Sequence, residues 1–563
     1  MQAIILAAGM GKRLKDLTEH NTKCMVEVNG VSLIDRMLHQ LERRKLSRIV
    51  VVVGYEGEKL MRYIDSLGIR TPVVYVKNPI FDKTNNIYSL ALAKEYLCRE
   101  DTLLLESDLI FDDAVIDTLL SDPRETLALV DKYESWMDGT CVKLGEDDSI
   151  QVFVPGKKFV FDECREYYKT VNLYKFSREF SLNYYVPFLD AYSKALGNNE
   201  YYEQVLRVLT MLDEPPIKAK RLDGQKWYEI DDVQDLDIAS SLFAEDDKRY
   251  FVTHDRKGGY WRYPKMIDFT NASNPFYPPS QMLDELKANT ETLVANFPSG
   301  DDTSDLLAAK NFSIRKEQIV VGNGLTELIR SLKENQEEPI LTLSNPDEIS
   351  GNYISKENMK QLIQWTKEKE ILMLVDESSV DYADETDAAL LTSDILKENP
   401  HLFVAKDLSK SFGIPGLRLG VLASGDISTM KRIKQDMPKW RINSFAEFYL
   451  QIAEKYKGDY ADSLCRFREE RARFKGELDR IDGVQVVSSQ SDFIVFALQK
   501  GTGLSSDEIV KRLLQKDNLL VCDYSEVTGN REASLIKAAI RSPEDNDRLV
   551  AALEWELSLE GRQ

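Results

Sequence analysis

In the stretch AIILAAGMGKRL, residues 3–14, an apolar run leads into glycines that are followed by two cations. Residues of these types at this spacing could bind phosphate groups. Glycines let backbone amides approach a phosphate closely, and adjacent cations offset its charge. A dinucleotide fingerprint would need a third glycine after Gly9 and Gly11, and a P-loop would need G-x-x-x-x-G-K-[ST]. Neither pattern is present. The loop is therefore predicted to bind phosphates, but not those of a dinucleotide. The alternative is an ordinary glycine turn with surface cations.

Alternating strands and helices must position this loop. Apolar runs such as AIILAA, RIVVVVG, PVVYVKN, DTLLLESD and TLALVD are predicted strands, and LIDRMLHQLERR and NIYSLALAKEYL are predicted helices between them. This alternation is typical of a largely parallel, doubly wound α/β sheet over the first 240 residues. A polar stretch at residues 244–265 is predicted to be a linker, because charges, aromatics and paired glycines replace the periodic pattern there. Alternation then resumes, with a charged amphipathic helix at 464–481 and a small α+β ending.

Composition limits the classes of function. A chain of 563 residues is too long for one ordinary core, so at least two domains are expected. The net charge of −21 argues against nucleic acid or an anionic membrane as a partner, and an anionic substrate would need a local cationic pocket, which Lys12, Arg13 and Lys23 could supply. Six scattered cysteines and four histidines argue against a zinc site. Without an apolar run long enough to span a bilayer or a signal peptide, the expected location is the cytoplasm.

The opening stretch resembles the nucleotidyltransferase signature L-A-A-G-x-G-x-R-L, and the resemblance covers residues 1–243. It implies a doubly wound domain in which Arg13 and Lys23 are catalytic cations, with Lys23, in NTKCMVEVNG, contacting the reacting phosphates. The residues that it implies for nucleotide binding are Leu6, Ala7, Ala8, Gly9, Gly11 and Lys12.

Two aspartates match the magnesium ligands of that family. Asp108 ends the apolar segment LLLESD, and Asp231 lies in WYEIDDVQDLDIA. Two carboxylates from separate strand ends can hold Mg²⁺ between the α-phosphate and an incoming oxyanion. Taken singly, Asp108 has the alternative role of a strand-end cap and Asp231 that of a helix N-cap. Their joint match to family positions favours the metal.

Within that family, NPIFDKTNNIYSLALA at residues 78–93 looks most like the phosphocholine and 2-aminoethylphosphonate cytidylyltransferases. The implied substrates are CTP and a small aminoalkyl phosphonate or phosphate, whose oxyanion needs no general base. The amine would need a cage of carboxylates or aromatic rings, although core packing is an equally good reading of the aromatic residues. The candidates for this cage are Tyr133, Trp136, Asp138, Tyr201 and Tyr202.

The segment AKDLSKSFGIPGLRLG, residues 405–420, resembles the lysine segment of class I/II pyridoxal-phosphate (PLP) aminotransferases. The resemblance covers residues 266–563 and implies a fold-type I domain that forms a homodimer. It implies that Lys410 bonds covalently to PLP, that Ser409 and Arg418 bind the cofactor phosphate, and that Asp376 pairs with the pyridine nitrogen. Asn323 lies in VVGNGLTELI, the loop and helix start implied to receive the phosphate.

Four departures from the aminotransferase pattern argue against efficient amine transfer. Only twenty residues, 325–344, fill an interval that usually holds a strand–helix–strand unit with a ring-stacking aromatic. Glu348 replaces the asparagine that donates to the phenolate oxygen, and Ser379 replaces a tyrosine that contacts the same atom. Lys537 stands where many members have a carboxylate-binding arginine, whose bidentate contact a lysine cannot reproduce.

The combination resembles the fusions of phosphonate synthesis, in which the second domain makes 2-aminoethylphosphonate and the first activates it with CTP. The alternative is a single-function cytidylyltransferase with a degenerate aminotransferase-like scaffold that serves dimerisation. A third class, a nucleotide-sensing regulatory protein, is disfavoured because Lys23 and both aspartates are present. The sequence leaves open 2-aminoethylphosphonate against phosphocholine, the base of the nucleotide, and whether the short 325–344 interval is natural.

Overall fold

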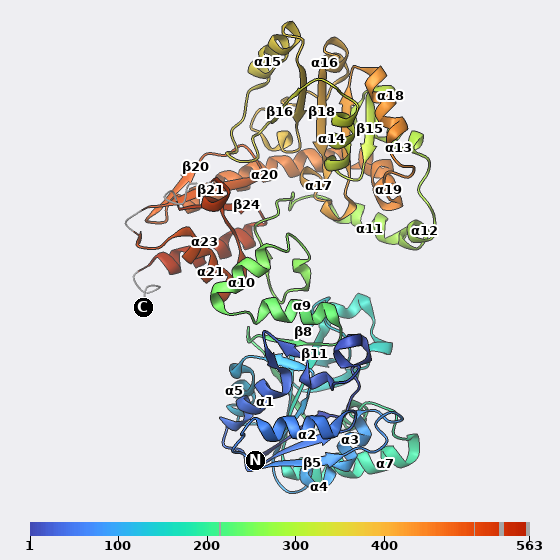
Figure 1. Ribbon diagram of the computed structural model, residues 1–563, viewed down its shortest axis with the longest axis vertical. Coiled ribbons are helices and arrows are strands. Elements are labelled where there is room, and N and C mark those ends of the chain that lie inside the picture. Colours follow the sequence, from blue (N-terminus) through green and yellow to red (C-terminus); the bar gives the residue numbers. More distant parts are fainter. Residues whose placement is uncertain (213–215, 500–501, 529–533, 559–563) are drawn as a thin grey trace. The chain divides into compact units, whose positions relative to one another are not determined.

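The computed structural model describes residues 1–212, 216–499, 502–528 and 534–558, and the chain divides into two compact units (Figure 1). The first unit comprises Met1–Thr253 and Gly259–Lys265, and the second comprises His254–Gly258 and Met266–Gln563. Most of the stretch expected to be a linker therefore belongs to the first unit, where it forms α10 (Asp246–His254) and η6 (Tyr260–Arg262). No described helix has both the length and the apolar character needed to cross a bilayer.

A nine-stranded sheet forms the centre of the first unit, with the order β10-β9-β11-β6-β1-β4-β5 and with β8 and β12 continuing from β11. Its parallel part consists of β6 (Thr102–Glu106), β1 (Gln2–Ala7), β4 (Ile49–Val53) and β5 (Val73–Lys77). These strands are near-continuous apolar runs because helices cover both faces of the sheet. The parallel strands of the sheet end at one edge, which brings the loops that follow β1 and β6 together.

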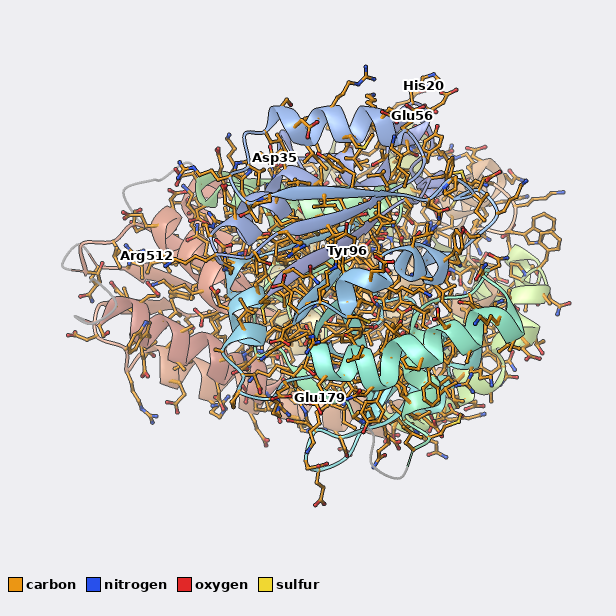
Figure 2. All side chains as sticks on the ribbon, turned by 90° about the horizontal axis from the view of Figure 1, so that it is seen from below. His20, Asp35, Glu56, Tyr96, Glu179 and Arg512 are labelled. Carbon is orange, nitrogen blue, oxygen red and sulfur yellow. The ribbon has the colours of Figure 1, made fainter. Side chains whose placement is uncertain are left out.

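Helices bury the two faces of this sheet separately. Ile5 of β1 packs with α1 (Leu33–Glu42), α2 (Gly57–Ser66) and α5 (Asp113–Leu120). Its neighbours Ile4 and Leu6 pack with helices on the opposite face, namely α3 (Asn86–Leu92), α4 (Lys94–Leu97), α7 (Val186–Leu196) and α8 (Glu203–Leu209). Polar side chains such as His20, Glu56 and Glu179 remain exposed on the outside of this unit (Figure 2).

The other half of the sheet departs from the parallel pattern. The strand β11 (Tyr167–Phe176) runs antiparallel to β6, to β8 (Leu127–Lys132) and to β9 (Cys141–Leu144). Its pairing with β8 shifts register between Thr170 and Tyr174, and Asn172 inside this bulge has φ 59°. The strand β9 pairs with β10 (Ile150–Val154), and β12 (Lys218–Arg221) pairs with β8. A bulge turns side chains out of the regular alternation, here toward the cavity described below.

The second unit contains a five-stranded sheet of order β15-β19-β18-β17-β16. The strands are β15 (Ile319–Gly322), β19 (Gly420–Ser424), β18 (Leu402–Asp407), β17 (Leu372–Asp376) and β16 (Ile340–Ser344), of which β19 alone runs antiparallel to its neighbours. On one face lie α14 (Leu325–Glu334) and α18 (Ile427–Asp436), and on the other lie α15 (Lys356–Glu368) and α19 (Ser444–Ile452).

The short interval after the glycine loop of this unit holds only α14 and the connection to β16. As a result β16 stands at the end of the strand order, and its Leu341 is 38% exposed. The predicted amphipathic helix at 464–481 corresponds to α20 (Lys457–Leu478), which begins earlier and ends three residues before the predicted end. The predicted α+β ending is a four-stranded sheet of β20 (Val484–Val487), β21 (Phe493–Leu498), β24 (Leu535–Ala539) and β23 (Cys522–Asp523), with α21 (Ser506–Asp517) and α23 (Pro543–Leu557).

Candidate active site

The glycine loop between β1 and η1 (Lys12–Thr18) forms one wall of a cavity of about 770 Å³, a size typical of small-molecule sites. Gly11 has φ +60°, and a Cβ atom there would lie 3.0 Å from Cβ of Lys23, so both backbone and space require glycine. No atom lies within 4 Å of a Cβ position at Gly9, which leaves the backbone there open to a ligand. Every residue predicted to bind the nucleotide lines this cavity, as do Arg13, Lys23, Asp108 and Asp231.

A short antiparallel ribbon brings the two aspartates together. Asp108 precedes β7 (Leu109–Phe111), and Asp231 follows β13 (Trp227–Glu229), which pairs with β7. The amide of Ile230 donates to the carbonyl of Asp108 at 3.0 Å. This pairing joins two segments that are more than 100 residues apart in sequence. It places both aspartates close to the carboxyl end of β6.

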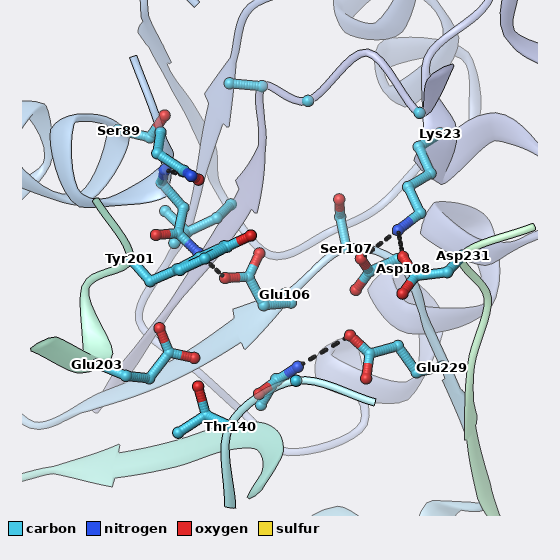
Figure 3. A pocket seen from close by; sticks show the side chains of 18 of the residues that line it. Lys23, Ser89, Glu106, Ser107, Asp108, Thr140, Tyr201, Glu203, Glu229 and Asp231 are labelled. Carbon is cyan, nitrogen blue, oxygen red and sulfur yellow. Dashed lines mark hydrogen bonds and ion pairs between the residues drawn. The ribbon is translucent and has the colours of Figure 1, made fainter. Parts of the chain in front are cut away.

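Lys23 lies between the two aspartates (Figure 3). Its Nζ atom is 2.6 Å from Oδ2 of Asp108 and 2.6 Å from Oδ1 of Asp231, while an Nη atom of Arg13 is 2.8 Å from Oδ2 of Asp231. Although burial acts in the opposite sense, the two carboxylates raise the pKa of Lys23 above its usual value. Against its own burial, the Lys23 ammonium lowers the pKa of Asp231.

The same place fits a divalent cation. Glu229 joins Asp108 and Asp231 in a group whose ligand oxygens lie within 4.8 Å of one another. Oδ1 of Asp108 is buried and has no hydrogen-bond partner. An all-oxygen donor set of this kind suits Mg²⁺. The sequence analysis missed Glu229, although its place two residues before Asp231 was a usable signal, because residues i and i+2 of an extended segment share a face.

Three glutamates also line the cavity (Figure 3). Glu106 ends β6 and accepts a hydrogen bond of 2.9 Å from Nδ2 of Asn86. Glu203 begins α8 and is 6% exposed, and its Oε2 atom has no partner. Glu229 accepts a 3.1 Å hydrogen bond from Asn172 and lies 3.1 Å from Nζ of the buried Lys169.

Burial shapes the protonation of these three acids. It raises the pKa of Glu203 to about 7 and that of Glu229 to about 6. The pKa of Glu106 is raised well above its usual value, first by burial and then by the charges of Asp108 and Glu203. We refer to Glu106, Glu203 and Glu229 as the glutamate cage. The buried cation Lys169 lies beside this cage, 3.1 Å from Glu229, and the cage itself holds three carboxyl groups.

The aromatic residues considered for the amine site divide into two groups. Trp136 stacks on Tyr228 with ring centroids 4.3 Å apart, and Tyr133 packs on Phe159 at 4.9 Å. Tyr202 is fully buried in the core around α8. Neither these two tyrosines nor Trp136 lines the main cavity, whereas Tyr201 and Asp138 do.

In the second unit, Lys410 lies on α17 (Leu408–Ser411) directly after β18. Its Nζ atom is 2.8 Å from Oε1 of Glu348. Asp376 ends the adjacent strand β17, accepts a 2.9 Å hydrogen bond from the amide of Ser378, and has its pKa raised by burial. The pairing of β17 with β18 therefore explains why Lys410 and Asp376 stand at one sheet edge.

The phosphate end of a PLP site fits the residues beside Lys410. Gly324 has φ +84°, and a Cβ atom there would lie 2.7 Å from an Nη atom of Arg418, so that the arginine lies against the start of α14. Oγ of Ser409 is buried without a partner. Asn323 precedes Gly324 in the same loop. A helix start, an arginine and an unpaired hydroxyl suit an anionic phosphate.

The substituted positions have specific contacts. Lys537 donates to the backbone carbonyl of Glu348 at 2.8 Å and lies 3.6 Å from the ring centroid of Phe493. Oγ of Ser379 is buried without a partner. Glu348 thus lies next to the amine of Lys410. Lys537, which replaces the carboxylate-binding arginine, already contacts Glu348 and Phe493.

The first unit has the architecture of a nucleotidyltransferase, and the second has that of a fold-type I PLP enzyme. Residues 3–142 match the MobA-like NTP transferase domain, and residues 310–553 match aminotransferase class I and II. The chain belongs to the cytidylyltransferase family in its first unit, and it carries a class I/II aminotransferase domain, a fold that implies PLP, in its second. The predictions of an α/β fold and of this fusion are confirmed.

Three relatives illustrate these similarities. CMP-5'-(3-aminopropyl)phosphonate synthase of Streptomyces rubellomurinus is 24% identical over 600 residues, covering 98% of this chain and 94% of that protein. CTP:phosphoglutamine cytidylyltransferase of Campylobacter jejuni is 30% identical over 256 residues, covering 42% and 98%. L-serine phosphate decarboxylase of Sulfurospirillum multivorans is 25% identical over 370 residues, covering 55% and 91%.

Proposed function

We propose that the first unit transfers a cytidylyl group from CTP to a small aminoalkyl phosphonate, preferably 2-aminoethylphosphonate, and releases pyrophosphate. The observation that carries this proposal is a single cavity with two chemically distinct parts. Cations and a glycine loop line one part of it, Glu106 and Glu203 line another, and Glu229 lies next to Asp108 and Asp231 between them. An acceptor with an anionic head and a cationic tail matches both parts.

At the nucleotide end, transfer needs the triphosphate charge neutralised and the acceptor oxygen held in line. Lys12 and Arg13 are placed to offset the β- and γ-phosphates, and Lys23 to bind the α-phosphate and the acceptor. Mg²⁺, held by Asp108 and Asp231, would supply further charge neutralisation at the α-phosphate. The acceptor oxygen is already an anion, so no side chain needs to remove a proton from it.

The glutamate cage favours a primary ammonium. Buried carboxylates without a cation are costly, so a cationic ligand is the natural complement of the cage. A primary ammonium donates three hydrogen bonds, and Oε2 of Glu203 is free of other partners. A trimethylammonium group would instead favour an aromatic box, but of the four candidate aromatic residues only Tyr201 lines the main cavity. This contrast supports 2-aminoethylphosphonate over phosphocholine.

The experiment that tests the proposal is a coupled pyrophosphate assay with CTP and an acceptor panel. The panel holds 2-aminoethylphosphonate, 3-aminopropylphosphonate and phosphocholine; the second is included because of the product named for the Streptomyces relative. We expect kcat/KM to be at least ~10-fold higher for 2-aminoethylphosphonate than for phosphocholine, as for one lost charged hydrogen bond. A higher kcat/KM for phosphocholine would overturn the choice of acceptor, and no pyrophosphate release with any acceptor would overturn the transfer reaction.

For the second unit, we propose that Lys410, Asp376, Ser409, Asn323 and Arg418 hold PLP, with weak amine transfer. When bound, PLP supplies an electron sink next to the amino-bearing carbon of a substrate. The carboxylate of Glu348 has no proton to donate to the phenolate oxygen of PLP, and the side chain of Ser379 is too short to take the place of a tyrosine hydroxyl. Glutamate-dependent transamination of phosphonoacetaldehyde, with Lys410→Ala as control, tests this proposal; robust turnover that is lost in the control would contradict it.

A second candidate for this unit is decarboxylation of a phosphorylated or phosphono amino acid. It is favoured by the similarity to L-serine phosphate decarboxylase over 55% of the chain. Loss of CO₂ from such a compound leaves an aminoalkyl phosphate or phosphonate, which is the acceptor class proposed for the first unit. Release of CO₂ from phosphoserine and phosphono amino acids, measured beside transamination, separates the two activities.

A further inference from the structure

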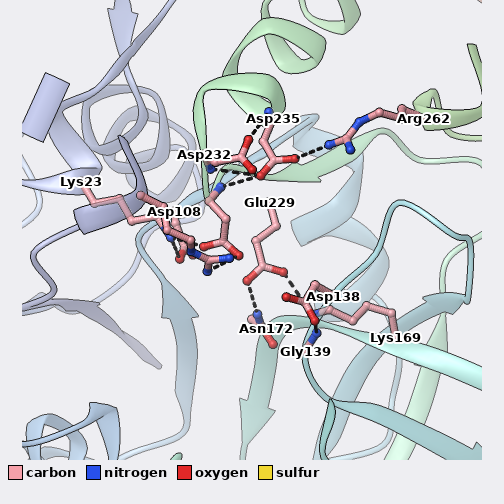
Figure 4. A network of polar contacts seen from close by, with 12 residues as sticks. Lys23, Asp108, Asp138, Gly139, Lys169, Asn172, Glu229, Asp232, Asp235 and Arg262 are labelled. Atoms are coloured by element: carbon pink, nitrogen blue, oxygen red, sulfur yellow. Dashed lines mark hydrogen bonds and ion pairs between the residues drawn. The ribbon is translucent and has the colours of Figure 1, made fainter. Parts of the chain in front are cut away.

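Arg262, in the stretch expected to be a linker, contacts Asp235, a residue close to the candidate metal ligand Asp231 (Figure 4). An Nη atom of Arg262, in η6, lies 2.8 Å from Oδ1 of Asp235, in α9 (Val233–Leu242). The exposed fractions of these two side chains are 16% and 12%. Arg262 lies four positions before Met266, but it belongs to the first unit.

Asp235 in turn holds the backbone of Asp231. Its Oδ2 atom accepts hydrogen bonds from the amide of Asp231 at 3.0 Å and from the amide of Asp232 at 3.1 Å. Asp232 caps α9 by accepting from the amides of Gln234 and Asp235 at 2.8 and 3.0 Å. Both oxygens of Asp235 are therefore used, one by the backbone that carries Asp231 and the other by Arg262.

A helix cap alone does not account for Arg262. The reciprocal bonds of Asp232 and Asp235 complete a capping box without any arginine. Arg262 adds a partly buried positive charge next to a region where Asp108, Glu229 and Asp231 already gather. Such a charge fixes the rotamer of Asp235 and offsets its carboxylate, which would otherwise add to the repulsion around Asp231.

The rest of the segment is anchored to the same unit. Oη of Tyr263 lies 2.6 Å from Oγ of Ser241 in α9, and the amide of Lys265 donates to Glu134 at 3.2 Å. The Nζ atom of Lys265 lies 3.4 Å from Oδ1 of Asp131, whose Oδ2 accepts a hydrogen bond from Nε1 of Trp227, and Lys265 has no described contact with Asp235. The residues that follow Arg262 are thus fixed to the same unit as Asp235, so the backbone that carries Arg262 is held in place.

We propose that Arg262, acting through Asp235, is a positioning residue for the metal carboxylate of Asp231. The inference rests on the proposed metal-dependent transfer reaction. Groups that orient metal ligands in this way typically change metal affinity by about 10- to 100-fold when they are removed. Arg262 does not touch substrate, so its loss should act on the metal more than on the nucleotide.

The test uses the full chain with Arg262→Met, Arg262→Lys and, as a matched control from the same segment, Lys265→Met. Binding of Mn²⁺ in the presence of CTP, without acceptor, is measured by electron paramagnetic resonance. The Mg²⁺ concentration for half-maximal pyrophosphate release and the midpoint of thermal unfolding are measured in parallel. We expect Arg262→Met to weaken Mn²⁺ binding by ~10-fold or more, Arg262→Lys to restore part of it, and Lys265→Met to match the wild type.

The outcomes separate the inference from the function on which it rests. Equal Mn²⁺ affinity of Arg262→Met and Lys265→Met overturns the inference. Weakened binding in Arg262→Met that Arg262→Lys does not restore, with an equal fall in the unfolding midpoint of both, also overturns it in favour of a structural role. Absence of metal-dependent pyrophosphate release by the wild type, in contrast, overturns the proposed reaction itself.

Discussion

The Nζ atom of Lys410 lies 2.8 Å from Oε1 of Glu348, so an ion pair joins the lysine proposed to bond PLP to the residue that replaces an asparagine of the family pattern. Lys537 fixes the backbone of Glu348 from the other side. Although burial acts in the opposite sense, Asp492 and Glu348 raise the pKa of Lys410 above its usual value. Less of the lysine is then neutral at pH 7–8, and only a neutral amine attacks an aldehyde.

Replacing Glu348 by Gln is therefore expected to increase the capture of PLP. The change removes one of the three carboxylates, those of Asp492, Glu348 and Asp376, that favour the protonated form of Lys410, and one pKa unit changes the neutral fraction about tenfold. Reduction with borohydride followed by mass spectrometry measures the fraction of chain that carries the cofactor. The control Lys410→Ala should carry none, and an unchanged or smaller fraction in Glu348→Gln would contradict the inhibitory role of this ion pair.

Replacing Asp108 by Ala is expected to lower the rate of pyrophosphate release by at least ~10²-fold, because it removes a carboxylate proposed to hold the Mg²⁺ that would stabilise charge at the α-phosphate. Initial rates at saturating CTP over a range of Mg²⁺ concentrations measure the effect. Asp113→Ala is a suitable control, since Asp113 forms surface ion pairs with Arg43 and Arg44. Near-normal turnover of Asp108→Ala would refute the assignment of Asp108 to the metal.

Replacing Glu203 by Gln is expected to raise KM for 2-aminoethylphosphonate by ~10-fold or more, with a much smaller effect on KM for CTP. The change keeps the size of the side chain but removes the negative charge that faces the ammonium. Steady-state kinetics with each substrate varied in turn measure both constants. Equal increases for CTP and acceptor would show that the substitution disturbs the whole cavity.

Acceptor binding is expected to weaken as the pH falls. Burial raises the pKa of Glu203 to about 7 and that of Glu229 to about 6, so both become neutral below these values in the free enzyme. A neutral carboxyl attracts an ammonium less than a carboxylate does, so KM for the acceptor should rise as pH falls from 8 to 5.5. In Glu203→Gln the part of this rise near pH 7 should disappear; an acceptor KM independent of pH in the wild type would argue against the cage as the ammonium site.

Much of the first unit follows from local sequence. Apolar runs such as AIILAA and RIVVVVG can be satisfied only by strands covered on both faces, and the glycines after the first run must lie at the strand end. Lys23, Asp108 and Asp231 were recognised because they match the nucleotidyltransferase pattern in residue type and in order along the chain. In the second unit, the same reasoning located Lys410, Asp376 and Arg418.

Tertiary structure alone decided what surrounds these residues. Glu106, Glu203 and Glu229 come from segments that are distant in sequence, and only sheet and helix packing brings their carboxylates into one cage. From the sequence, Trp136 was a candidate to bind a cation. In the structure it stacks on Tyr228 and does not line the main cavity. Arg262 lies in a polar, aperiodic stretch, because its place is fixed by an ion pair to α9 and not by any local pattern. Periodicity predicts secondary structure, and motifs predict the roles of single residues. The charge and burial around those residues depend on long-range side-chain contacts, which only the whole fold determines.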